Sequence, residues 1–314
     1  MRIIVTGGAG FIGSHIVDAY LAAGHQVLVI DNLFEHGGGR RENLDPRASF
    51  ANRDIGDPSL VDIFRDFRPD IVSHHAAQAS VAIGSRDPQF DARVNVLGLL
   101  NVLDATSAVG ARKVIFASSG AIYGEPVELP MTEATLQVPT SPYGISKMVA
   151  EHYLRFYHAE RGLDFTALRY GNVYGPRQDP EGEAGVIAIF LGKFLAGEGV
   201  RIDSDGEQTR DYVYVGDVVA ANIAALERGG GKSYVIATGR RTSVNEIYRT
   251  LIEVTGFTAP LQYCPKRPGD VRDAQFDTTL ARRDLGWEPK VSLREGFAHT
   301  HEFFRAKAGA KAHT

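Results

Sequence analysis

The sequence predicts an α/β protein, in which a doubly wound parallel sheet is followed by a smaller mixed α/β domain. Through the first half, short β-branched runs bounded by Gly, Pro or Asp alternate with amphipathic stretches. This alternation is typical of buried strands with helices packed over them. After about Tyr170 the helix and strand signals shorten, because Gly, Pro and charged residues crowd the segment that follows. The length of 314 residues suggests about two domains.

Five apolar runs in the first half are predicted to form strands of the sheet, since each ends at turn-forming residues. They are Arg2–Thr6, Gln26–Ile30, Ile71–Ser73, Lys113–Ala117 and Asp164–Arg169. The helical patterns between them end at Gly24, before Pro69 and at Gly110, and Ser141 can cap the last one. These helices are Ile12–Ala23, Ser59–Phe67, Phe90–Val109 and Pro142–Arg161.

A glycine-rich turn joins the first strand to the first helix, and its spacing fits both G-x-G-x-x-G and G-x-x-G-x-x-G. Glycine is needed here because the chain turns sharply and its backbone amides must come close to a pyrophosphate. The positive end of the helix dipole adds to that site. We therefore expect a Rossmann-type dinucleotide site that includes Gly7, Gly10, Phe11, Ile12 and Gly13.

An acid, Asp31, stands at the end of the second strand and is followed by Asn32. A carboxylate there can accept hydrogen bonds from ribose hydroxyls and repels a 2′-phosphate, so the sequence favours NAD over NADP. Asp54 and Ile55 are expected to end the third strand, where they could flank the adenine. An ordinary turn explains those two residues equally well.

The domain boundaries follow from these patterns. Residues 1–170 are predicted to form the NAD-binding domain, and residues 211–238 return to it through Asp211–Glu227 and Ser233–Ala237. Residues 171–210 and 239–305 are predicted to form the substrate domain. The small and polar tail, residues 306–314, is expected to fray.

Two segments contain residue types suited to proton transfer. Ser119 lies at the predicted carboxyl end of a parallel strand, where ligands bind in open sheets. Tyr143 and Lys147 are four residues apart on one face of the long helix. A nearby ammonium and a positive nicotinamide ring would favour the phenolate form of Tyr143, which could then take a proton from a sugar hydroxyl. Ser119 would orient the same oxygen. A surface helical pair is the alternative for Tyr143 and Lys147.

Composition excludes several other classes. The formal net charge of −4 makes a nucleic-acid-binding protein improbable. One cysteine, Cys264, rules out a disulfide within the chain, and the ten histidines show no metal-ligand spacing. His74 and His75 are expected to pack and to hydrogen-bond rather than to hold a metal. With no signal peptide and no apolar run of about 20 residues, we expect a cytoplasmic protein with no membrane contact.

With these motifs in place, the chain resembles the extended short-chain dehydrogenases/reductases, and within them the UDP-glucose 4-epimerases (also called UDP-galactose 4-epimerases). The resemblance runs from Arg2 to about Phe304. Further segments carry it in the order of the family: His74–Val81, Asn95–Gly98, Leu168–Gln178, Gln208–Val215 and Arg267–Asp270.

The resemblance implies roles for further residues. On the cofactor side these are Ala76, Ala77, Gln78, Asn95 and Tyr170. The residues that would hold the UDP-sugar are Asn172, Val186, Arg210, Arg267 and Asp270. Guanidinium groups match phosphate oxygens in two-point contacts, although each arginine could instead be a solvated surface charge. Ala274 falls at a family position near the C2 substituent of the sugar, unless the loop is shifted.

The family reaction inverts C4 of the sugar through a 4-keto intermediate. By the resemblance, Tyr143 takes the proton of the 4-hydroxyl, the C4 hydride passes to resident NAD, and the keto sugar turns over before the hydride returns. The family also implies a homodimer formed through the helices Phe90–Val109 and Pro142–Arg161.

Single positions distinguish this chain from related enzymes that have other activities. The 4,6-dehydratases carry an Asp-Glu pair where this chain has Gly120 and Ala121, and the decarboxylating UDP-glucuronate enzymes keep the Glu. UDP-glucuronate epimerases usually continue Gly-Pro-Arg-Gln with Arg-Pro, whereas this chain continues with Asp179-Pro180. The small Ala274 leaves UDP-N-acetylhexosamines open as substrates, and UDP-glucuronate remains a further alternative. A non-catalytic dinucleotide-binding regulator is the alternative from a different class.

Overall fold

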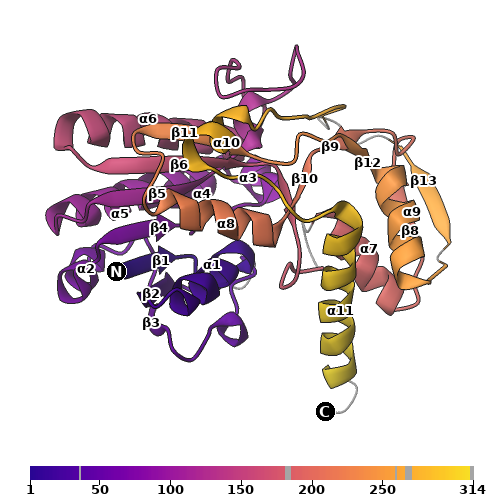
Figure 1. Cartoon of the computed structure of the whole chain (residues 1–314), viewed down its shortest axis with the longest axis horizontal. Helices are drawn as coiled ribbons and strands as arrows, with labels where there is room; N and C mark the ends of the chain where they lie inside the picture. Colours follow the sequence, from indigo (N-terminus) through magenta and orange to yellow (C-terminus); the bar gives the residue numbers. More distant parts are fainter. Residues whose placement is uncertain (35–36, 181–184, 259, 266–270, 312–314) are drawn as a thin grey trace.

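The computed structural model describes residues 1–34, 37–180, 185–258, 260–265 and 271–311. A seven-stranded parallel sheet has the order β11-β6-β5-β4-β1-β2-β3 (Figure 1). The chain order reverses between β1 and β4, which is the point where ligands bind in open α/β sheets. The strands are β1 (Arg2–Thr6), β2 (Gln26–Asp31), β3 (Ser49–Asn52), β4 (Ile71–His74), β5 (Lys113–Ser119), β6 (Asp164–Tyr170) and β11 (Lys232–Ile236).

Helices cover both faces of this sheet because its strands are apolar on both faces. In β1, Ile3 and Val5 pack into one core, whereas Ile4 packs into the other. One face is covered by α1 (Phe11–Ala22), α8 (Val215–Ala225) and α10 (Thr279–Leu285). The opposite face is covered by α2 (Leu60–Phe67), α5 (Gly98–Ala108) and α6 (Pro142–Arg161).

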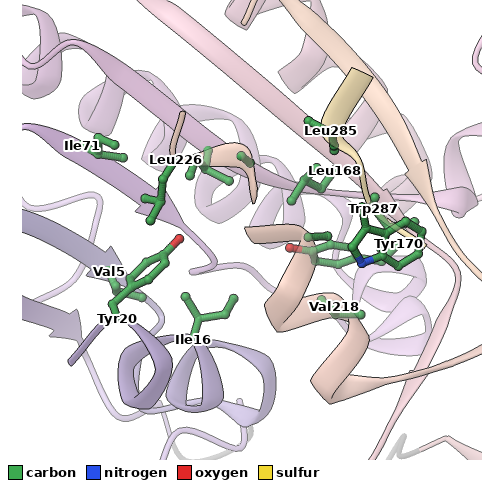
Figure 2. Packing of buried hydrophobic residues seen from close by; sticks show 14 of the residues in the cluster. Val5, Ile16, Tyr20, Ile71, Leu168, Tyr170, Val218, Leu226, Leu285 and Trp287 are labelled. Atoms are coloured by element: carbon green, nitrogen blue, oxygen red, sulfur yellow. The ribbon is translucent and has the colours of Figure 1, made fainter. Parts of the chain in front are cut away.

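Figure 2 shows the first of these cores. Tyr20 and Ile16 of α1, Val218 of α8, Tyr170 of β6 and Trp287 belong to this one cluster. The indole Nε1 of Trp287 donates to the Asp217 carbonyl at 2.8 Å. Trp287 therefore ties the segment after α10 to α8, on the same face of the large sheet.

The second half contains three two-stranded sheets within the described residues. The pairs are β7 (Asn172–Tyr174) with β10 (Tyr212–Tyr214), β9 (Thr209–Arg210) with β12 (Thr242–Ser243), and β8 (Val200–Asp203) with β13 (Leu261–Cys264). Another core joins the β7–β10 and β8–β13 pairs to α7 (Val186–Leu195), α9 (Val244–Thr255) and α11 (Leu293–Lys311). In Figure 1 this part lies to one side of the large sheet.

Several predicted elements need correction. The helix expected over Phe90–Val109 is continuous from Pro88 to Ala108 but contains an unexpected π-helical turn: α4 (Pro88–Ala92), the turn over Arg93–Leu97, and α5. Such turns are frequent at functional sites. A short helix, α3 (Val81–Arg86), precedes them. Asp54 and Ile55 lie beyond the third strand, because β3 ends at Asn52.

Two more segments differ from the expectation. Of the stretch Asp211–Glu227, α8 packs on the large sheet, but β10 pairs with β7 outside it. The chain from Ala306, expected to fray, stays helical to Lys311. No helix among the described residues combines the length and the apolar composition needed to cross a bilayer.

Candidate active site

The glycine turn lies at the carboxyl edge of the sheet, between β1 and α1. Gly7 has a φ of +69°, and a Cβ there would lie 2.5 Å from the Ala76 amide nitrogen. A Cβ on Gly13 would overlap the Gly7 carbonyl. No described side chain caps α1, and its first turn carries no acidic residue. Amides at this helix start therefore suit an anion.

A cavity with a volume of about 320 Å³ opens beside this turn. It contains nine of the residues that the sequence assigned to the cofactor: Gly7, Gly10, Asp31, Asn32, Asp54, Ile55, Ala76, Ala77 and Gln78. Phe11, Ile12 and Gly13 lie in the first turns of α1, behind the lining. The cavity is lined by several loops and its walls are mostly apolar, so it can hold the adenosine half of a dinucleotide.

Asp31 ends β2 at the wall of this cavity. Its Oδ2 accepts from the Ala9 amide at 3.0 Å, and its Oδ1 accepts from the Leu33 amide at 2.9 Å. Burial raises the pKa of this carboxyl, and the two amides oppose that rise. A Cβ on Gly39 would lie 2.9 Å from Asp31 Oδ1, so the chain comes close on this side.

The far wall is formed by the loops after β2 and β3. Asn32 Nδ2 donates to Asp54 Oδ2 at 2.7 Å, which ties these loops together. The rings of Phe34 and Phe90 lie 5.7 Å apart at the cavity. Sequence reasoning missed several lining residues, although many stand next to predicted ones: Ile30, Phe34, Gly37, Gly39, Arg53, His75, Phe90 and Val94.

Asn95 lies behind the cavity, in the π-helical turn. Its Oδ1 accepts from the Gln78 amide at 2.8 Å, and its Nδ2 donates to the Gln78 carbonyl at 2.9 Å. The same Nδ2 lies 3.2 Å from Ser146 Oγ on α6 and 3.2 Å from Asp91 Oδ2. The Asp91 carboxylate is buried and also accepts from Gln78 Nε2 at 3.0 Å. Asn95 thus links the cofactor loop to the long helix.

Ser119, Tyr143 and Lys147 form one cluster where β5 meets α6. The Ser119 side chain lies near the Tyr143 phenol, and its Oγ accepts from the Ala121 amide at 3.1 Å. Lys147 is buried; its Nζ donates to the Ala117 carbonyl at 2.8 Å and lies 5.7 Å from the centre of the Tyr143 ring. The helix begins at Pro142 because the Ser141 hydroxyl accepts from the Gly144 amide at 3.1 Å.

Burial is the largest influence on the pKa values of this cluster. Burial raises the pKa of Tyr143 above its usual value; the nearby Ser119 side chain lowers it, and the Asp91 charge raises it further. Burial lowers the pKa of Lys147 to about 8, and Asp91 opposes that change. Without a cofactor the cluster therefore holds a neutral phenol, and a phenolate requires further positive charge.

Tyr170 ends β6 and is buried. Its hydroxyl accepts from Asn222 Nδ2 at 2.9 Å and lies 3.1 Å from His75 Nε2. Burial, followed by Lys147, lowers the pKa of His75 to about 3, so this ring is neutral. His74 pairs with Thr6 Oγ1 at 2.6 Å. No group of three potential metal ligands occurs among the described residues.

Three of the residues assigned to the sugar nucleotide, Asn172, Arg210 and Ala274, lie around Thr209–Asp211. The Asn172 amide donates to the Asp211 carbonyl at 2.8 Å, and the Ala274 amide donates to the Thr209 carbonyl at 3.1 Å. Arg210 stands between these two contacts, with Nη1 2.9 Å from the Thr209 carbonyl. Val186 begins α7 and packs against the second-half core. Arg267 and Asp270 lie outside the described residues.

Phe276 connects this region to the catalytic turn. A Cβ on Gly120 would overlap the Phe276 ring, and a Cβ on Gly171 would lie 3.7 Å from the same ring. Ala274 and Phe276 share a buried cluster with Ile122 of that turn. The segment containing Ala274 therefore packs against the turn that follows Ser119.

Comparison with known proteins identifies the family. Residues 3–237 match the model of the NAD dependent epimerase/dehydratase family, so the chain belongs to that family. A UDP-glucose 4-epimerase of Mycolicibacterium smegmatis is 44% identical over 98% of this chain and 100% of its own length. The fold is that of the family's α/β enzymes.

Two solved structures are similar along nearly their whole length. A UDP-glucose 4-epimerase of Thermotoga maritima with UDP-glucose is 51% identical with a TM-score of 0.95, covering 98% of this chain and 100% of that one. A Thermus thermophilus UDP-glucose 4-epimerase in complex with NAD is 44% identical with a TM-score of 0.91, covering 97% and 99%.

Proposed function

We propose that this chain is an NAD-dependent UDP-glucose 4-epimerase, which inverts C4 of a UDP-hexose and acts in galactose metabolism. The observation that carries the proposal is the cluster of Ser119, Tyr143 and buried Lys147 where β5 meets α6. Ser146 of the same helix is linked through Asn95 to the loop of Gln78 at the cavity beside the glycine turn. The similarity to UDP-glucose 4-epimerases over nearly the whole chain supports it.

The described residues fit NAD. The glycine turn accepts a pyrophosphate, and Asp31 offers a carboxylate to ribose hydroxyls while opposing a 2′-phosphate. Bound NAD supplies the acceptor and donor for the C4 hydride, and its positive ring favours the phenolate of Tyr143. Lys147 adds positive charge beneath that phenol, and Asn95 holds the loop of Gln78 against the cofactor site.

The chain's own side chains transfer the proton and hold the nucleotide. Tyr143 takes the proton of the sugar 4-hydroxyl as the 4-keto sugar forms, while Ser119 donates a hydrogen bond that orients the same oxygen. The keto sugar then turns, and Tyr143 returns the proton to the oxygen on the other face. Arg210 and Arg267 hold the diphosphate, and Asn172, Val186 and Asp270 hold the rest of the nucleotide, so the hexose is free to turn.

Gly120 argues against the dehydratase reaction of the same family. A dehydratase needs an acid at this place, yet any Cβ there overlaps the Phe276 ring. Ala121 also lacks a titratable group, and its amide donates to Ser119 Oγ at 3.1 Å. The turn after Ser119 is therefore packed for orienting one hydroxyl rather than for eliminating water.

A second substrate class, the UDP-N-acetylhexosamines, is favoured by one observation. Ala274 is small and follows the strand contact between Thr209 and Asp273, next to Arg210. UDP-glucuronate is disfavoured, because Asp179 is an acid and is already paired with Arg40 at 2.5 Å. A non-catalytic regulator would leave the cluster of Ser119, Tyr143 and Lys147 without a role.

We also propose a cytoplasmic homodimer with residues 1–170 and 211–238 as its NAD-binding domain. Three apolar side chains near α5 and α6 support the dimer: Leu97 is 59%, Phe156 is 51% and Ile145 is 47% exposed. In a symmetric helix bundle, these three side chains would be buried against the partner and shielded from water. The single cysteine is consistent with a reducing compartment.

The first test is the turnover of UDP-galactose by the purified protein with no nicotinamide added. Formation of UDP-glucose establishes the reaction and resident NAD together. If there is no turnover even with NAD supplied, UDP-N-acetylhexosamines and UDP-glucuronate are tested next. Failure of all three, while NAD still binds, overturns the enzyme proposal in favour of a regulator.

A further inference from the structure

A buried ion pair joins the catalytic helix to the sheet. Glu151 lies one turn after Lys147 on α6 and is 0% exposed, and Arg169 near the end of β6 is 1% exposed. Arg169 Nε donates to Glu151 Oε1 at 2.8 Å, and Nη2 donates to Oε2 at 2.7 Å. This two-point contact fixes direction as well as distance.

The pair also contacts the segments on which the catalytic residues stand. Ser118, next to Ser119, donates from Oγ to Glu151 Oε1 at 2.7 Å. Arg169 Nη1 donates to the hydroxyl of Tyr123, in the turn after Ser119, at 2.8 Å. Ser233 of β11 donates to Glu151 Oε2 at 2.8 Å. One network thus joins β5, the turn after it, α6, β6 and β11.

Stability alone is a weak reason for this arrangement. Removing two charges from water is expensive, and a buried ion pair often contributes no more than well-packed apolar side chains of the same size. The rest of this α6 face packs through Ala150, Leu154 and Tyr157. Apolar packing of this kind has little directionality, so it holds the helix on the sheet without setting its position along the sheet.

We propose that Glu151 and Arg169 are positioning residues, which hold α6 at the height where Tyr143 meets Ser119 and Lys147 meets the Ala117 carbonyl. The inference rests on the proposed roles of the catalytic cluster. Neither residue lines the cofactor cavity, so the pair acts through Ser118, through the turn after Ser119, and through the helix itself. A misplacement of about 1 Å at a reacting group can lower turnover by about 100-fold.

The test is the double variant Glu151→Met with Arg169→Met, assayed with UDP-galactose. It removes both charges together, so neither is left buried and unpaired. We expect kcat to fall by about 100-fold, with the KM for UDP-galactose and the bound NAD content unchanged within about 3-fold. A purely structural role predicts that thermal stability falls while kcat of the folded fraction stays at the wild-type value, and that result overturns the proposal.

Two milder variants decide the matter if the double variant does not fold. Ser118→Ala removes one hydrogen bond to Glu151, and Tyr123→Phe removes one acceptor of Arg169 Nη1, so both keep the ion pair. We expect both to lower kcat by about 3- to 10-fold at unchanged KM, with Tyr123→Phe the less affected because Nη1 also donates to the Glu133 carbonyl. Wild-type kcat in both contradicts the positioning role.

A matched control lies on β5, the strand of Ser118, at its opposite end. Lys113 is 3% exposed, and its Nζ donates to the Arg228 carbonyl at 2.6 Å, far from the catalytic turn. Lys113→Met should lower thermal stability and leave kcat unchanged. Tyr143→Phe separates the two failures: if it keeps wild-type turnover, the proposed mechanism is wrong; if it is inactive while the double variant is fully active, only the positioning role is wrong.

Discussion

The two sides of the proposed active site are held in different ways. On the catalytic side, Tyr143 and Lys147 stand on a helix of 20 residues, and Ser119 ends a strand of seven. On the substrate side, Arg210 stands on a strand of two residues. Long elements set the reacting groups through many contacts, whereas the substrate side depends on a few hydrogen bonds.

One carboxylate supplies most of those bonds. Asp211 is fully buried and accepts from the Thr238 amide at 2.7 Å, from its hydroxyl at 2.6 Å, and from the Gly239 amide at 2.8 Å. Substitutions that alter the chemistry and substitutions that alter substrate preference should therefore lie in different parts of the molecule. Chemistry should respond to changes at β5 and α6, and preference should respond to changes around Asp211.

The largest expected effect is on the catalytic side. Tyr143→Phe removes the proposed acid and base, so turnover of UDP-galactose should fall by about 1,000-fold while NAD stays bound. Tyr153→Phe, a partly buried tyrosine on the same helix, is the matched control and should keep full activity. Wild-type turnover in Tyr143→Phe would exclude this tyrosine as the base.

The second prediction concerns the substrate side. Asp211→Ala leaves the amides of Thr238 and Gly239 without their acceptor, so the free energy of unfolding should fall by about 3 kcal/mol. Because Arg210 is adjacent, the KM for the sugar nucleotide should rise more than kcat falls. Asp217→Ala is the control, since Asp217 of α8 accepts from the Lys290 and Val291 amides on one face of the large sheet. Its KM should not change, and an equal rise in both variants would break the comparison.

The third prediction tests the cofactor wall. Asp31→Ala removes the acceptor of two amides and the carboxylate that faces the ribose. NAD affinity should fall by about 10- to 100-fold, and the discrimination against NADP should relax. Asp57→Ala, in an exposed turn beyond β3, should bind both cofactors as the wild type does. Unchanged cofactor preference in Asp31→Ala would remove this residue from the site.

The smallest expected effect is a shift along the pH axis. The reaction needs Lys147 protonated, and its pKa of about 8 in the free protein predicts that kcat/KM falls above about pH 8. Asp91→Asn removes a charge that raises this pKa, so the decline should move to lower pH. Asp104→Asn, whose carboxylate binds the Tyr157 hydroxyl, should leave the profile in place; a shift in both variants would show that the effect is not local.

Much of the large sheet was predictable from the sequence. The bounds Arg2–Thr6 and Pro142–Arg161 are those of β1 and α6, because strong β-branched runs and a Ser-Pro helix start are local signals. The glycine turn and Asp31 were predictable for the same reason, since each is recognised from the residues directly beside it in the sequence. Nine predicted residues meet at one cavity because parallel strands bring their carboxyl ends to one edge.

The sequence by itself determined the layered fold, the glycine turn and the spacing of Tyr143 and Lys147, which all depend on neighbours along the chain. Only the tertiary structure decided the π-helical turn in the helix over Phe90–Val109, the burial of Glu151 against Arg169, and the packing of Phe276 on Gly120. Those features join residues from separate segments, and their energies depend on burial and on contact geometry. A linear pattern holds the residue types for such contacts but not the distances between them.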